Sequence, residues 1–75
     1  MTNEELWNGI INLAAINNMT CSGLARFANL DPTIFNKSKR TNKFGQLRWP
    51  STYALAKILD ATHTSLEDFA KMMKS

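Results

Sequence analysis

The chain has 75 residues, 44% of them hydrophobic and 20% charged, which predicts one folded domain over residues 1–75 and excludes a disordered chain. Its one cysteine, Cys21, excludes an intrachain disulfide, and the net charge of +3 is too small to identify a partner unless the charges cluster. No apolar run is long enough to span a membrane and the start of the chain lacks a signal-peptide pattern, so we expect a cytoplasmic domain with no membrane partner.

The first predicted helix covers residues 3–17. Asn3 or Thr2 can cap its start, and Glu4 and Glu5 favour the positive end of its dipole. Apolar side chains recur at spacings of three and four residues, which is typical of an amphipathic helix. The inward-facing positions are Leu6, Ile10, Leu13 and Ile16 or Asn17, with Trp7, Ile11 and Ala14 beside them.

Two short helices are predicted next, at residues 20–29 and 32–38. Thr20 is a good N-cap for the first, and Asn29 tolerates the left-handed conformation that ends a helix. Asp31 then provides a new N-cap, and Pro32 suits the first position of a helix. Two short helices joined by so tight a turn predict a helix-turn-helix, whose second helix can enter the major groove of DNA.

The second of these helices offers a small polar face. If Phe35 points into the core, helical spacing turns Thr33 and Lys37 outward, with Ile34 and Asn36 beside them. A hydroxyl, an amide, an apolar group and a cation can contact base edges, a thymine methyl and phosphates. The alternatives are that these are ordinary solvated residues and that Ile34 completes the core.

Residues 39–50 lose all periodicity and carry positive charge. Five cations fall within twelve residues with no acid among them: Lys37, Lys39, Arg40, Lys43 and Arg48. Next to a helix-turn-helix they favour phosphate contacts, although a solvated loop is the alternative. We expect a surface loop that Phe44, Leu47 or Trp49 pins by reaching into the core; stacking of Phe44 and Trp49 on bases is a weaker alternative.

The remaining residues predict two more helices. One runs from Ser51 to Thr62, and the other begins after a cap at Thr64 or Ser65. Their expected inner faces consist of Leu55, Ile58, Leu59 and Thr62, and of Leu66, Phe69 and Met72 or Met73. The fold class predicted is therefore all-α, with five short helices around one core and the helix-turn-helix at the second and third.

Several stretches resemble one family: Met19-Thr20, Leu24-Ala25, Leu30 to Phe35, Pro50-Ser51 and Ser65 to Phe69. Together they are similar to the Xre/Cro-type, lambda-repressor-like DNA-binding domain of phage repressors. The stretch from Asp31 to Arg40, with Arg48 to Ser51, is similar to a narrower group of bacterial repressors in which a LexA-like peptidase domain often follows. The resemblance implies either the N-terminal piece of such a protein or a stand-alone binder.

The resemblance also implies roles for particular residues. The family's base-reading positions fall on Pro32, Thr33 and Lys37, and its contacts to the DNA backbone fall on Thr20, Cys21 and the segment after the third helix. The chain departs from the family at Asn29 and His63, where glycine is preferred, and at Cys21, where a phosphate-binding glutamine is frequent. The long basic connection is not general in the family either.

Catalysis and metal binding find no support in the sequence. His63 is the only histidine and has no second ligand at metal-binding spacing, and no nucleophile–base pair stands out. We therefore expect no enzyme activity, no cofactor and no small-molecule substrate. The sequence predicts a sequence-specific double-stranded DNA-binding regulator, a repressor of phage or prophage type, acting as a homodimer on an operator. The alternative is a protein-interaction module, such as an antitoxin or anti-regulator.

Overall fold

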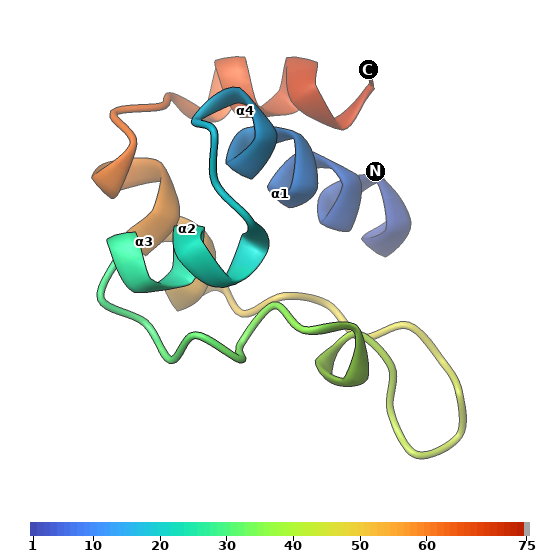
Figure 1. Cartoon of the computed structure of the whole chain (residues 1–75). Coiled ribbons are helices and arrows are strands. Elements are labelled where there is room, and N and C mark those ends of the chain that lie inside the picture. Colours follow the sequence, from blue (N-terminus) through green and yellow to red (C-terminus); the bar gives the residue numbers. More distant parts are fainter. Residues whose placement is uncertain (75) are drawn as a thin grey trace.

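The computed structural model of the chain describes residues 1–74 and is helical throughout its core (Figure 1). The elements in chain order are α1 (Asn3–Ile16), α2 (Cys21–Phe27), the short 3-10 helix η1 (Lys37–Lys39), α3 (Thr52–Ala61) and α4 (Leu66–Met73). α1 packs against α4 and α2, and α2 packs against α3. The chain between α2 and α3 crosses one end of the molecule, forms a projecting loop, drawn in yellow in Figure 1, and then returns to α3.

The expectation of five helices is wrong, because the described residues contain four α-helices and the one predicted at residues 32–38 is missing. This segment forms turns, in which the N–H groups of Ile34 and Asn36 donate to carbonyls three residues earlier. The Asp31 side chain holds Thr33, and Asn36 is extended at ψ 151°. Two β-branched residues in so short a segment give an α-helix little intrinsic stability, so local turn bonds prevail. The helix-turn-helix is therefore absent.

The other four predicted helices are present, and side-chain hydroxyls cap each of them. Thr2, Thr20, Ser51 and Ser65 each accept a hydrogen bond from the backbone N–H three residues later. At α1 the side chain of Glu5 also accepts from the Thr2 N–H, which completes a capping box. Each cap satisfies one of the N–H groups that a helix start leaves unpaired.

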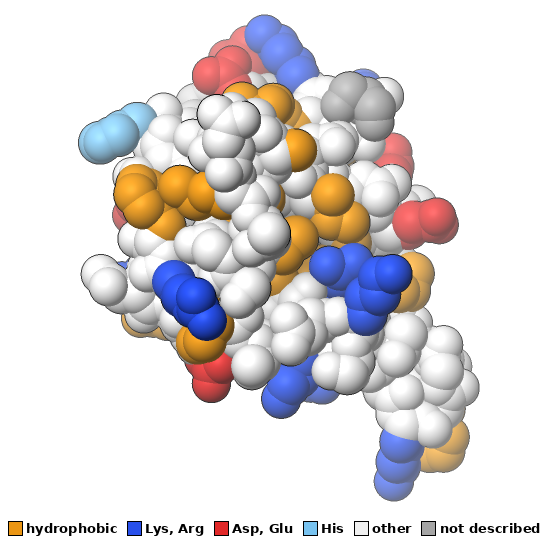
Figure 2. Space-filling model, viewed as in Figure 1, with side chains coloured by type: hydrophobic (Ala, Val, Ile, Leu, Met, Phe, Trp, Pro, Cys, Tyr) orange, Lys and Arg blue, Asp and Glu red, His pale blue; other side chains and the backbone are white. Residues whose placement is uncertain are grey.

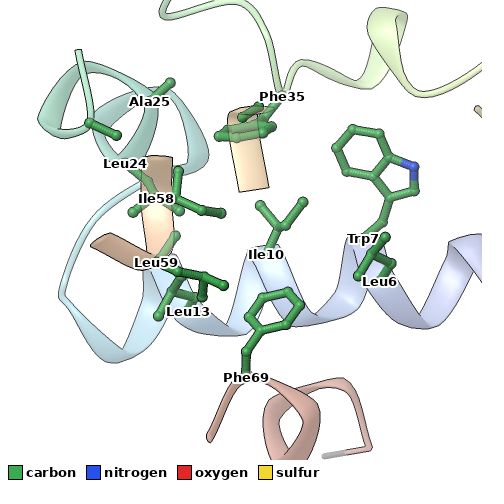
Figure 3. Packing of buried hydrophobic residues seen from close by; sticks show 13 residues of the cluster. Leu6, Trp7, Ile10, Leu13, Leu24, Ala25, Phe35, Ile58, Leu59 and Phe69 are labelled. Carbon is green, nitrogen blue, oxygen red and sulfur yellow. The ribbon is translucent and has the colours of Figure 1, made fainter. Parts of the chain in front are cut away.

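One apolar core joins the helices (Figure 3). Ile10 and Leu13 of α1 lie at its centre, and Figure 3 shows Phe69 of α4 on one side of them and Phe35, from the chain after α2, on the other. The buried hydrophobic residues are Leu6, Trp7, Ile10, Leu13, Ala14, Leu24, Ala25, Ala28, Phe35, Ala54, Ile58, Leu59 and Phe69. The inward orientation predicted for Phe35 is confirmed, since it is 1% exposed.

Two side chains assigned to inner faces are exposed instead: Leu66 at 69% and Ile11 at 38%. Of the alternatives Ile16 and Asn17, Ile16 is 63% exposed and Asn17 is half-buried. Leu66 is the first residue of α4 and Ile16 the last of α1, so both lie at a helix end. Within residues 1–74, none of the helices combines the length and apolar character needed to cross a membrane.

Candidate functional site

The chain between α2 and α3 contains most of the residues predicted to bind a partner. It begins with a turn at residues 31–36 and continues through residues 37–48, here called the basic segment, which contains all five clustered cations. No acidic residue occurs between Asp31 and Asp60 in the sequence. Figure 2 shows Lys and Arg side chains across the lower half of the view and at the tip of the projecting loop. The basic segment therefore gives this end of the molecule an excess of positive charge, with the exposed Asp31 beside it.

The turn at residues 31–36 is built around one carboxylate. Oδ1 of Asp31 accepts hydrogen bonds from the backbone N–H of Thr33 at 2.8 Å and from its hydroxyl at 2.7 Å. These two bonds, and to a lesser extent the charge of Lys39, hold the pKa of Asp31 below its ordinary value. The Thr33 hydroxyl thus uses its donor within the turn and keeps only acceptor capacity for a ligand.

The four residues predicted to read bases differ in their exposure. Thr33, Asn36 and Lys37 are exposed, whereas Ile34 is half-buried and packs against the core. Pro32, a fifth position implied by the family resemblance, is also half-buried. Because the segment is not an α-helix, Thr33 and Lys37 do not lie one turn apart on a helix face, and any reading of bases would use a turn.

Beyond η1 the chain forms a hairpin over residues 40–48, which was not predicted. Thr41 and Leu47 form an antiparallel bridge, and Asn42 N–H donates to the Gln46 carbonyl at 2.8 Å. Gly45 closes the turn by donating to the Asn42 carbonyl at 3.0 Å, and its φ of 77° favours glycine. The sequence signal was Asn42 at the first position of a turn and Gly45 at the fourth.

The hairpin is held to the rest of the molecule by polar contacts with α1. The Trp7 indole N–H donates to the Arg48 carbonyl at 2.8 Å, and the Asn3 side-chain amide donates to the Leu47 carbonyl at 3.0 Å. The prediction that Phe44, Leu47 or Trp49 would pin this loop by entering the core is wrong: they are 74%, 41% and 57% exposed. Trp7 takes that role because its ring is in the core while its N–H reaches the hairpin.

Arg40 supports the hairpin as well. Its Nε donates to the Phe35 carbonyl at 3.1 Å, and its guanidinium lies 5.4 Å from the centre of the Trp7 ring. A second guanidinium nitrogen is 3.8 Å from Sγ of Cys21, which brings the start of α2 next to the hairpin. Because Arg40 is half-buried and makes these contacts, it is the least available of the five cations for a phosphate. Lys37, Lys39, Lys43 and Arg48 are exposed.

The residues predicted for phosphate contact at α2 are close to the basic segment but are partly engaged. Thr20 is exposed, and its hydroxyl accepts the Gly23 N–H as the helix cap. Cys21 is half-buried against the core. A surface pocket of about 330 Å³ brings together residues predicted to read bases and residues predicted to contact phosphates. It is lined by Thr33 and Ile34 of the first kind and by Lys39 and Arg48 of the second. Sequence reasoning missed the hairpin and its anchors, Trp7 and Asn3.

No family model, curated protein or solved structure matches the chain. Within residues 1–74, no three His, Cys, Asp or Glu side chains lie close enough together to hold a metal ion.

Proposed function

We propose that this protein binds double-stranded DNA with sequence preference, as a transcriptional regulator of repressor type, and that the basic segment provides the contact surface. The observation that carries the proposal is the exposed set Lys37, Lys39, Lys43 and Arg48 on a stretch of chain without acids. Closely spaced cations without interspersed acids neutralise a row of phosphates and release their counterions. That the chain belongs to the Xre/Cro-type group, which its sequence resembles, stays a prediction.

Sequence preference is assigned to the exposed polar residues beside these cations. Asn36 lies between the Asp31 turn and η1, and its side chain makes no capping bond to η1. An amide can pair with adenine through one donor and one acceptor, and Lys37 can reach guanine or a phosphate. Thr33 contributes an acceptor, because its hydroxyl donates to Asp31. A dimer on a two-fold symmetric site would supply the contact area that one small module lacks.

A binding experiment with three matched variants tests this proposal. Sites are first selected from a random duplex library, and the affinities for the selected duplex and a random duplex are then measured over a range of salt concentrations. We expect Lys39→Ala to weaken binding to both duplexes equally. It should also reduce the slope of log affinity against log salt concentration by about one. Asn36→Ala should lower the affinity for the selected duplex by about tenfold and the affinity for the random duplex much less. Lys71→Ala, the same loss of charge on α4, should change neither.

A second candidate function is favoured by an apolar groove that meets the pocket beside the basic segment at Trp49 and Pro50. A pocket of about 400 Å³ between α1, α3 and α4 is lined by Leu6, Trp49, Leu55, Leu66 and Phe69, among others. Trp49 and Leu66 are more than half exposed there, which suits a protein partner, as in an antitoxin or anti-regulator. Failure to bind random duplex even at low salt would refute the DNA-binding proposal and favour this one.

A further inference from the structure

Phe44 occupies an unusual position for a large apolar side chain. It is 74% exposed at the tip of the hairpin, while Phe35 and Phe69 are 1% and 2% exposed in the core. Its neighbour Lys43 lies at the same tip, with Nζ 5.2 Å from the centre of the Phe44 ring. These two residues occupy the middle of the turn that Asn42 and Gly45 close, so they are the outermost part of the loop.

The tip is preorganised by hydrogen bonds. Oδ1 of Asn42 accepts from the N–H of Phe44 at 2.9 Å and from the N–H of Gln46 at 3.1 Å, and the Asn42 amide donates to the Gln46 side chain at 3.1 Å. The base of the hairpin is fixed to α1 through Arg48 and Leu47. A side chain on an ordered turn loses little conformational freedom on binding, so its contact area contributes more to affinity.

The surroundings of Phe44 identify the kind of partner. The ring projects from the basic segment, whose charged side chains are all positive and of which Lys37, Lys39, Lys43 and Arg48 are exposed. The amide side chains of Asn42 and Gln46 flank the tip. Cations extending along the chain fit a row of phosphates, and Asn and Gln pair with acceptors in the minor groove. A single aromatic ring beyond such groups is suited to entering a stack of bases.

We propose that the hairpin tip enters the minor groove of duplex DNA and that the Phe44 ring inserts between two adjacent base pairs as an apolar wedge. This inference rests on the proposed DNA binding and adds a way to deform the duplex. Insertion unstacks one base step and bends the DNA, and the bend brings more phosphates to the basic segment. Because pyrimidine–purine steps unstack most easily, the wedge should prefer a TA step, which adds a shape-dependent element to site preference.

The test uses a mixed-sequence duplex in which 2-aminopurine replaces the adenine of a central TA step, since the fluorescence of this base rises when it is unstacked. We expect the intact protein to raise the fluorescence at saturation. Phe44→Ala should bind about tenfold more weakly and produce no rise even when saturating. Phe44→Leu should keep most of the rise, because leucine also acts as a wedge. Phe27→Ala, which removes an exposed phenyl ring from α2, should behave like the unmodified protein.

Each contrary outcome points to a different failure. Salt-dependent duplex binding without any fluorescence rise, or with a rise that Phe44→Ala retains, overturns the wedge and leaves the DNA-binding proposal standing. No duplex binding at low salt overturns both. A parallel titration with vesicles containing anionic phospholipid completes the test: Phe44-dependent vesicle binding without a rise on DNA overturns the wedge in favour of a membrane contact.

Discussion

At the scale of single residues, Asp31 shows how one exposed carboxylate favours a local chain reversal. As a helix cap it would accept the N–H of a residue two or three positions into a helix. Here it accepts both the N–H and the hydroxyl of Thr33, two residues on, which closes an Asx turn. The same residue types are compatible with both outcomes, so the local sequence favours a chain reversal at Asp31 without deciding whether a helix follows.

The lowered pKa of Asp31 gives a prediction with a definite sign. Because its folded-state pKa lies below the ordinary value of 3.8, the ionised carboxylate favours the folded state. This contribution is fully present above about pH 4 and is lost as the pH falls through the folded-state pKa. Asp31→Asn keeps an oxygen acceptor but cannot titrate, so its denaturation midpoint should fall less than that of the original chain between pH 4 and pH 2. An NMR titration that gives Asp31 a pKa of 3.8 or higher would contradict the argument.

At the scale of elements, a glycine sets the distance between α1 and α4. A Cβ built on Gly9 would lie 2.8 Å from both Cγ of Met73 and Cζ of Phe69, and Phe69 is too buried to move aside. A Cβ built on Gly23 in α2 would have only Oγ1 of Thr20 at 3.3 Å and Cβ of Met19 at 3.7 Å nearby. The two helices that approach closely at a glycine are therefore α1 and α4.

A pair of matched substitutions measures this contact. Gly9→Ala should lower the free energy of unfolding by about 1 kcal/mol, because overpacking costs about 1–3 kcal/mol and improved helix propensity returns about 1 kcal/mol. Gly23→Ala has the same gain in propensity and displaces only a capping hydroxyl, so we expect a change within about 0.5 kcal/mol. Urea denaturation of both variants decides the point. Equal changes in the free energy of unfolding at the two sites would show that α1 and α4 can move apart without loss of stability.

At the scale of the whole molecule, Trp7 couples the core to the candidate site. Its ring packs edge-on against Phe35 at a centroid distance of 6.3 Å, its N–H holds Arg48, and Arg40 lies over its face. One residue of α1 therefore touches the turn, the hairpin and the core at once. This side chain therefore helps to fix the orientation of the basic segment relative to the helices, together with Arg40.

Trp7→Phe separates the two roles of the side chain. Phenylalanine retains most of the core contact but removes the hydrogen bond to Arg48, so the free energy of unfolding should fall by about 1–2 kcal/mol. The Arg48 amide, which donates to the Arg40 carbonyl at 2.7 Å, should exchange with solvent faster, and by a larger factor than the α3 amides. Hydrogen exchange followed by NMR measures both. Uniform acceleration at all amides would mean that Trp7 acts only through the core.

The sequence by itself determined the features that depend on short-range contacts. Caps at Thr20 and Ser51 fix helix starts, because each bond spans three residues. Asn29 has the predicted left-handed conformation, with φ 60°. The positive cluster is also a property of the sequence, so the cations of the candidate site could be named, although their geometry could not.

Only the tertiary structure decided what residues 31–50 become. Local preferences there allow a helix, a turn or an open loop at similar free energies, so contacts distant in sequence decide among them. The bonds from Trp7 to Arg48 and from Asn3 to Leu47 connect the first helix to a hairpin far along the chain. No periodicity within the segment encodes those bonds. With the hairpin held there, Phe44 is exposed at its tip and Phe35 packs edge-on against Trp7 in the core, although both are phenylalanines in one connecting segment.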